Sequence, residues 1–174
     1  MESLLKEYLA ELAKRYQAHY SVETNQVITG LQLDIYAISI MEHFRNVITK
    51  KIKIDQYQER EIILVKGFDQ FVQDEDAKDF SRFLIRAAGE LVIPSLNVMS
   101  HTINGILVSA QGFSEEAIKS VRKFRYGKTY CLGIKGWCDI RFLLLDIKNK
   151  EIYYNAKGKE IKEIYRFTKR TGVI

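Results

Sequence analysis

The chain has few residues that can form disulfide cross-links or interrupt helices and strands, with two cysteines and one proline among 174 residues. Cys131 and Cys138 are too few and too close together for a disulfide framework, so we expect both thiols to be reduced. A single proline with ten glycines leaves no room for a long disordered linker. The length suffices to bury a hydrophobic core without metal or disulfides, and we expect one globular domain over residues 1–174.

Long apolar runs are also missing from the sequence. Its start, "MESLLKEYLAELAKRY", carries charges throughout and so lacks the apolar core of a secretory signal. The run "FLLL" at 142–145 is far shorter than a membrane span. We therefore expect a cytoplasmic protein that has no membrane partner.

The motifs of common catalytic chemistry are absent as well. His19, His43 and His101 are isolated from one another and from the cysteines, without the spacing of metal ligands. The acidic stretch "DEDAKD" at 74–79 lacks the glycine that a calcium loop needs at its sixth position. No serine or cysteine lies in a nucleophile motif. The sequence therefore predicts no metal, no cofactor and no covalent catalysis.

Hydrophobic periodicity predicts an α/β (α+β) fold with the element order α-β-β-β-α-β-α-β-β. Helical spacing of apolar residues predicts helices near the N-terminus, in "DEDAKDFSRFLIRAAGEL" and in "GFSEEAIKSVRKF". The segments "VITGLQLDIYAISIME", "VITKKIKIDQY" and "REIILVKGF" predict an antiparallel three-strand meander. "INGILVSA" predicts the next strand, and "GWCDIRFLLLDI" with "EIYYN" predicts a closing hairpin. We expect a mixed central sheet, begun by the meander and flanked by helices.

Two resemblances accompany this pattern. Over nearly its full length the sequence is similar to an uncharacterised bacterial domain family marked by "LDIYA", "FRYGKTYCLGIKGWCDIRFLLLD" and "NAKGKE". This similarity implies a shared fold and no known activity. The element order also resembles that of restriction-endonuclease-like domains, and "ILVSAQGFSEEAIKSV" resembles the strand and helix that follow the catalytic core in their Mrr-type members.

The second resemblance implies an alternative function, a metal-dependent nuclease that uses Mg²⁺. Such a site needs carboxylates for the metal and a lysine near the attacking water. Lys66 lies in the right kind of strand, but Leu64 stands where the pattern requires a carboxylate. The alternative is therefore a non-standard or degraded site made of Asp34, Asp55 and Lys66, with Glu61 as a further carboxylate nearby.

One segment stands out by charge. Six basic residues and no acidic residue lie between Ala117 and Cys138, although the net charge of the whole chain is only +5. Aromatic residues that could stack on bases are interleaved with these cations. Our main hypothesis is non-catalytic binding of a polyanion, such as nucleic-acid phosphate. The residues expected to bind it are Lys119, Arg122, Lys123, Arg125, Lys128, Lys135, Trp137 and Arg141.

Plainer interpretations stand beside this hypothesis. The cations are equally explained as the solvated face of an amphipathic helix, and Trp137 as an anchor at the boundary of the core. Asp139 and Arg141 lie two residues apart on one strand face, which suits a structural ion pair. A third hypothesis is an interaction protein or self-assembling subunit whose aromatic surface includes Tyr8, Tyr16 and Tyr20. A homo-oligomer is compatible with the sequence but nothing in the sequence indicates one.

Overall fold

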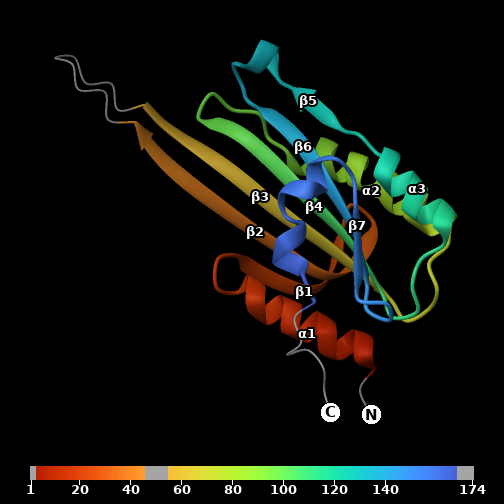
Figure 1. Cartoon of the computed structure of the whole chain (residues 1–174). Coiled ribbons are helices and arrows are strands. Elements are labelled where there is room, and N and C mark those ends of the chain that lie inside the picture. Colours follow the sequence, from red (N-terminus) through yellow and green to blue (C-terminus); the bar gives the residue numbers. More distant parts are fainter. Residues whose placement is uncertain (1–2, 46–54, 168–174) are drawn as a thin grey trace.

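The computed structural model describes residues 3–45 and 55–167 and confirms a mixed sheet flanked by helices (Figure 1). Helix α1 (Leu4–Tyr16) precedes the meander of β1 (Ser21–Ile28), β2 (Leu31–Arg45) and β3 (Asp55–Phe68). Helix α2 (Asp74–Leu91), β4 (Val98–Ser109) and α3 (Glu115–Lys123) follow. The chain then forms β5 (Gly127–Thr129), β6 (Trp137–Asp146) and β7 (Glu151–Tyr154). Short 3-10 helices follow β5 at η1 (Cys131–Gly133) and follow β7 at η2 (Lys157–Glu160) and η3 (Lys162–Tyr165).

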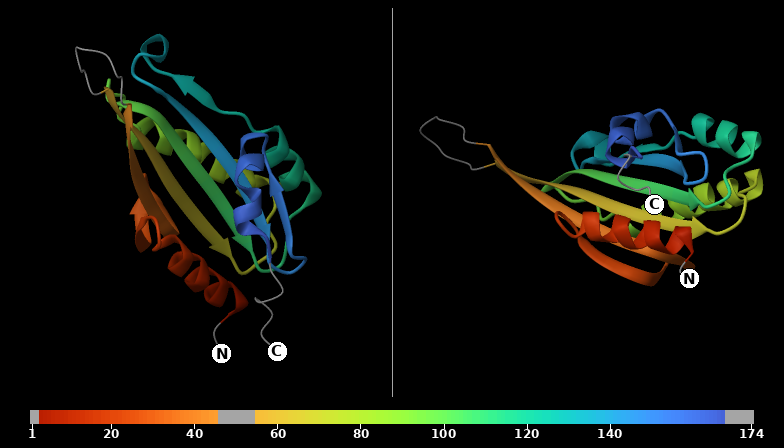
Figure 2. Two further views of the ribbon diagram at one scale, coloured as in Figure 1. Left: turned by 60° about the vertical axis from the view of Figure 1, so that its left-hand side comes forward. Right: turned by 60° about the horizontal axis from the view of Figure 1, so that its bottom comes forward.

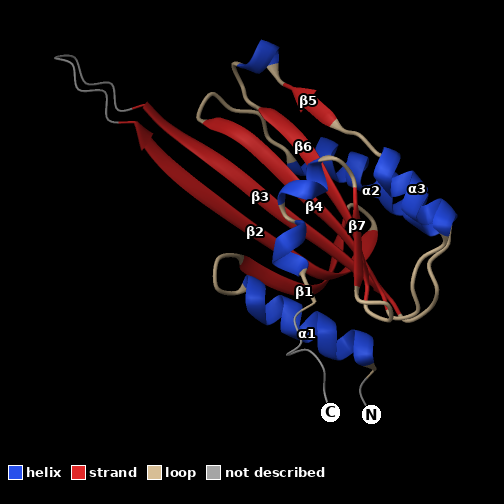
Figure 3. Ribbon diagram, viewed as in Figure 1, coloured by secondary structure: helices blue, strands red, loops and turns tan. Residues whose placement is uncertain are grey.

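The strand order is β1-β2-β3-β4-β6-β5, and β7 pairs with β6 beside β5. Strands β3, β4 and β6 are parallel neighbours, whereas all other pairs are antiparallel. The crossover helices α2 and α3 lie on one face of the sheet, and α1 lies on the other (Figures 2 and 3). Each face therefore has its own core.

The element order is confirmed, but the boundaries within the meander differ from the prediction. The chain reverses at Thr29 and Gly30, which both have positive φ (45° and 83°), as a two-residue hairpin turn requires. Strand β1 is polar because it is an edge strand whose residues are mostly exposed, so it lacks the apolar alternation that marks a strand. Most of the predicted strand "VITKKIKIDQY" lies outside the described residues.

Both faces of β6 are buried, which explains the apolar run in its sequence. Phe142 and Leu144 pack beneath α2 and α3, and Leu143 and Leu145 pack on the side of α1. Helix α2 approaches the sheet closely at Gly105 of β4. A Cβ atom built on this glycine would lie 2.3 Å from the Leu84 Cδ1 of α2, so a larger residue would displace the Leu84 side chain or the helix that carries it.

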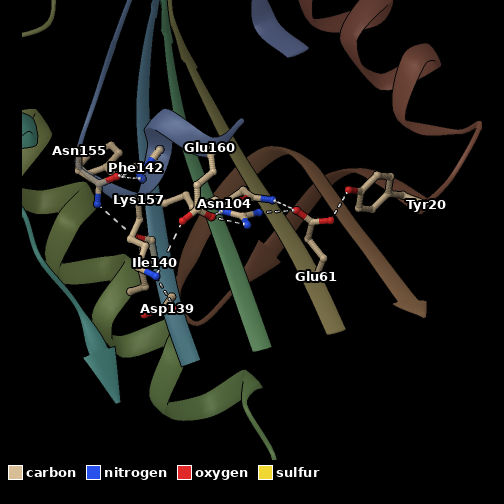
Figure 4. A network of polar contacts seen from close by, with 11 residues as sticks. Tyr20, Glu61, Asn104, Asp139, Ile140, Phe142, Asn155, Lys157 and Glu160 are labelled. Carbon is tan, nitrogen blue, oxygen red and sulfur yellow. Dashed lines mark hydrogen bonds and ion pairs between the residues drawn. The ribbon is translucent and has the colours of Figure 1, made fainter. Parts of the chain in front are cut away.

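A single asparagine completes the outer edge of β6. Strand β5 pairs with residues 137–139 of β6 and β7 pairs with residues 143–146, which leaves a gap between them. Asn155, only 1% exposed, fills this gap with its side chain. Its Nδ2 donates to the Ile140 carbonyl at 3.0 Å, and its Oδ1 accepts from the Phe142 amide at 3.0 Å and the Gly158 amide at 2.8 Å (Figure 4).

We expect Asn155→Ala to lower the free energy of unfolding by about 2–4 kcal/mol, because it leaves buried backbone groups of β6 without partners. Chemical denaturation measures the change. The matched control is Asn97→Ala, because Asn97 lies exposed in the connection between α2 and β4. Equal denaturation midpoints for the two variants would contradict this role of Asn155.

Candidate functional site

A row of polar residues crosses the α1 face of the sheet where this face would otherwise be apolar. Glu61 lies on β3, Asn104 on β4 and Arg141 on β6, and Asn104 is directly opposite Arg141 in the strand register. Two residues further along the same strands, Ile63, Ile106 and Leu143 belong to the core beneath α1. The polar row thus lies at the border of this core.

The Glu61 carboxylate is the centre of the row and receives three donors. The Tyr20 hydroxyl donates to its Oε2 at 2.6 Å, while Asn104 Nδ2 and Arg141 Nη1 reach its Oε1 at 2.6 Å and 3.1 Å (Figure 4). Burial and the hydrogen bond to Glu61 raise the pKa of Tyr20 well above its ordinary value. Tyr20 therefore stays protonated and remains a donor at neutral pH.

Arg141 connects Glu61 to a second carboxylate on η2. Its Nη2 and Nε contact Glu160 Oε2 at 2.8 Å and 3.2 Å. Lys157 Nζ lies 3.9 Å from Glu160 Oε1 and 3.2 Å from Asp139 Oδ2. The result is a chain of alternating charges that runs from β3 across β6 to η2 (Figure 4). The ion pair suggested for Asp139 and Arg141 is replaced by this longer connection, in which each residue pairs with η2.

A cavity of about 470 Å³ opens beside the polar row, between the end of α1, the sheet and η3. Leu12, Ile63 and Ile161 contribute apolar walls, and Glu61 and Asn104 contribute polar ones. The Tyr16 hydroxyl donates to the Tyr165 hydroxyl at 2.8 Å, and both rings line the cavity. Its volume falls within the range of small-molecule sites.

Most of the predicted polyanion-binding cations lie along a different part of the molecule. We call Lys119, Arg122, Lys123, Arg125, Lys128 and Lys135 the basic edge, because they follow α3, β5 and the β5–β6 connection along one border of the molecule (Figure 1). All six are exposed. Arg141 is not part of this edge, since it is only 19% exposed and is ion-paired on the α1 face.

Within the described part of the chain, Lys119 alone among the basic-edge residues has an acidic partner, Glu115 at 3.5 Å. Arg125 donates to the backbone carbonyl of Arg122 at 2.6 Å. Arg122 lies over the Tyr153 ring at 5.7 Å, and Lys128 lies over the Tyr130 ring at 5.2 Å. The contacts of Arg122, Arg125 and Lys128 thus leave their charges uncompensated.

The β5–β6 connection also exposes apolar side chains. Leu132 is fully exposed, Ile134 is 68% exposed and Trp137 is 40% exposed, so Trp137 is not a buried core residue. Leu132 has a φ of 54°, a left-handed conformation that is uncommon for a leucine. Of the tyrosines suggested as an interaction surface, Tyr8 and Tyr16 are buried on the sheet side of α1. Tyr20 is partly buried, so the three tyrosines do not form an exposed aromatic surface.

The residues of the nuclease alternative do not gather in one place. Lys66 Nζ lies 3.9 Å from Asp34 Oδ2, which also accepts from the Gly67 amide at 2.7 Å. Asp55 begins β3, eleven residues before Lys66, which corresponds to about 35 Å along an extended strand. Leu64 is fully buried. Among residues 3–45 and 55–167, no cluster of three metal-ligating side chains occurs.

Sequence reasoning missed the importance of Asn104, Lys157, Glu160 and Tyr20, and considered Glu61 only as a metal ligand. A signal for the strand residues was present, because Glu61 and Asn104 each precede an apolar run at the position where the inward-facing pattern would continue. Partners so far apart in sequence could not be paired from that signal. Glu61 is 43 residues from Asn104 and 80 residues from Arg141, and Arg141 is 19 residues from Glu160.

Comparisons with known proteins identify one family. A family model described as Domain of unknown function (DUF8052) matches residues 5–167. No curated protein and no solved structure matches the chain. The resemblance to restriction-endonuclease-like domains gains no support from these comparisons. In the part of the chain described here, no helix is long and apolar enough to cross a membrane.

We expect Arg141→Ala to lower the free energy of unfolding by about 1–3 kcal/mol, because the largely buried Glu61 would lose its cationic partner. The exposed Lys123→Ala is the control and should change stability by at most about 0.5 kcal/mol. Thermal and chemical unfolding measure both variants. If Arg141→Ala is as stable as Lys123→Ala, the charge network is not structural.

Proposed function

We propose that this chain, which belongs to the DUF8052 family, binds single-stranded nucleic acid through phosphate contacts along the basic edge. The observation that carries the proposal is the alignment of five exposed cations without acidic partners, Arg122, Lys123, Arg125, Lys128 and Lys135, along one border of the described chain. Lys119 extends this line on α3. Such a border attracts a polyanion by releasing the counterions that surround its phosphates.

Aromatic rings along the same border support nucleic acid over other polyanions. Trp137 is 40% exposed at the start of β6, and Tyr130 lies beneath Lys128. Rings of this kind stack on unpaired bases without regard to sequence. A hollow of about 520 Å³ lies beside β5, lined in part by Arg125, Tyr126 and Gly127. This hollow offers a place for a phosphate or a ribose next to the Arg125 guanidinium.

Arg141 has no direct part in this proposal. Its guanidinium is engaged by Glu61 and Glu160 on the face of the sheet that α1 covers. Recruiting it to a phosphate would require breaking both contacts. The binding surface is therefore the basic edge together with Trp137, and Arg141 supports the fold of β6.

We expect a labelled oligothymidylate to bind with an affinity that falls steeply with salt. With about four phosphates neutralised, the log-log slope is about −3 and the affinity drops on the order of 100-fold between about 50 and about 200 mM salt. Replacing Arg125 and Lys128 together by alanine should make the slope shallower, from about −3 to about −1.5. Fluorescence anisotropy over a salt series measures both quantities.

The matched control replaces Lys6 and Lys14 together by alanine, because these exposed cations lie on α1, away from the basic edge. This pair should leave the slope unchanged. Heparin and vesicles with anionic headgroups serve as competing polyanions. No salt-dependent binding of the oligonucleotide, an equal effect of the two double variants, or binding of vesicles alone would each overturn the proposal.

A further inference from the structure

The cavity at the end of α1 has a chemistry that the basic edge does not explain. It lies on the α1 face of the sheet and contains none of the basic-edge residues. Leu12, Ile63, Ile161 and Ile164 contribute apolar side chains to its walls, together with the rings of Tyr16 and Tyr165. A cavity with apolar walls and a few convergent polar groups is typical of a site for a small organic molecule.

The negative charge in the cavity is already satisfied. Glu61 receives donors from Tyr20, Asn104 and Arg141, so its carboxylate has little capacity left for a ligand cation. The Arg141 guanidinium compensates its charge directly at 3.1 Å. An incoming ammonium group would therefore gain little from Glu61.

The positive charge at the mouth of the cavity is not satisfied. Arg15 is exposed in the last turn of α1, lines the cavity, and has no ion pair among residues 3–45 and 55–167. Burial raises the pKa of the Tyr16 and Tyr165 hydroxyls, and the Arg15 charge partly offsets this rise, as expected for a guanidinium close to that pair. An anionic group at the mouth would meet a cation there.

An acceptor in the wall is also without a partner. Asn104 donates through Nδ2 to Glu61, but its buried Oδ1 accepts no hydrogen bond from the described residues. Leaving such an acceptor buried and unsatisfied is costly. That atom is buried, so the unmet interaction that a ligand in the cavity can reach is the Arg15 cation at the mouth, next to the apolar walls.

We infer that this cavity binds a small organic acid, with its apolar body between α1, η3 and the sheet and its carboxylate at Arg15. The chemical class follows from the apolar walls, the compensated Glu61 and the uncompensated Arg15. A medium-chain or aromatic carboxylate satisfies these conditions.

Isothermal titration calorimetry with three probes of equal chain length tests the inference: decanoate, decanol and decylammonium. We expect saturable binding of decanoate, weaker binding of the uncharged decanol, and the weakest binding of decylammonium. Arg15→Gln should weaken decanoate by about tenfold, as for the loss of one charge-assisted contact, and leave decanol unchanged. The matched control is Lys14→Gln, which removes the neighbouring exposed cation that does not line the cavity.

A variant that fills the cavity distinguishes binding inside the cavity from binding elsewhere on the surface. Ser39→Phe places a ring in the cavity from a partly exposed position of β2 and should abolish binding of decanoate and decanol alike. Ile164→Trp fills it from the 63% exposed side of η3 and replaces Ser39→Phe if that variant does not fold, as judged by circular dichroism.

Three outcomes would overturn the inference. These are no saturable decanoate binding to the folded wild-type chain, stronger binding of decylammonium than of decanoate, and decanoate affinity that is the same in the folded filling variant and in wild type. The oligothymidylate measurement should be unaffected by Arg15→Gln and Ser39→Phe, because the basic edge lies outside the cavity. Failure of one proposal therefore leaves the other standing.

Discussion

The position of the Arg141 guanidinium between two carboxylates is the contact on which the arrangement of the α1 face depends. Glu61 belongs to the meander and Glu160 to the short helices after β7, so Arg141 of β6 joins the meander to the C-terminal helices. The charges are less than one-fifth exposed at Arg141 and Glu61, where water screens them weakly. Because η3 follows η2 directly, the contact of Arg141 with Glu160 also positions η3 and its Tyr165 at the edge of the cavity.

The fold could largely be predicted from the sequence because both helix and strand periods were carried by apolar residues. The helices α2 and α3 bury the faces that helical spacing indicates, including Phe83 and Leu84 on α2 and Val121 on α3. Strand β1 could not be recognised, because an exposed edge strand has no buried face to impose alternation. The role of Asn155 was equally hidden, since it satisfies backbone groups and not side chains.

The candidate site was predictable only where it depends on local sequence. The basic edge is formed by residues close together in the chain, so its charge was evident before the fold was known. The charge network and the cavity combine α1, β3, β4, β6 and the C-terminal 3-10 helices, and no spacing rule connects such distant segments. Arg141 illustrates the difference. Its position in the sequence suggested that it belongs to the basic segment, but strand alternation directs its side chain to the α1 face of the sheet.

The close contact between Gly105 and Leu84 has a consequence for how sequences of this kind can diverge. Because the Leu84 side chain occupies the space where any side chain at position 105 would lie, a larger residue at 105 requires a smaller or shifted side chain at 84. The α1 face has a similar pair, since a Cβ atom on Gly67 of β3 would lie 2.9 Å from the Leu9 Cδ1 of α1. Positions that pair a glycine of the sheet with a leucine of a helix are therefore expected to change together, whereas the residues that line the cavity have room to change independently.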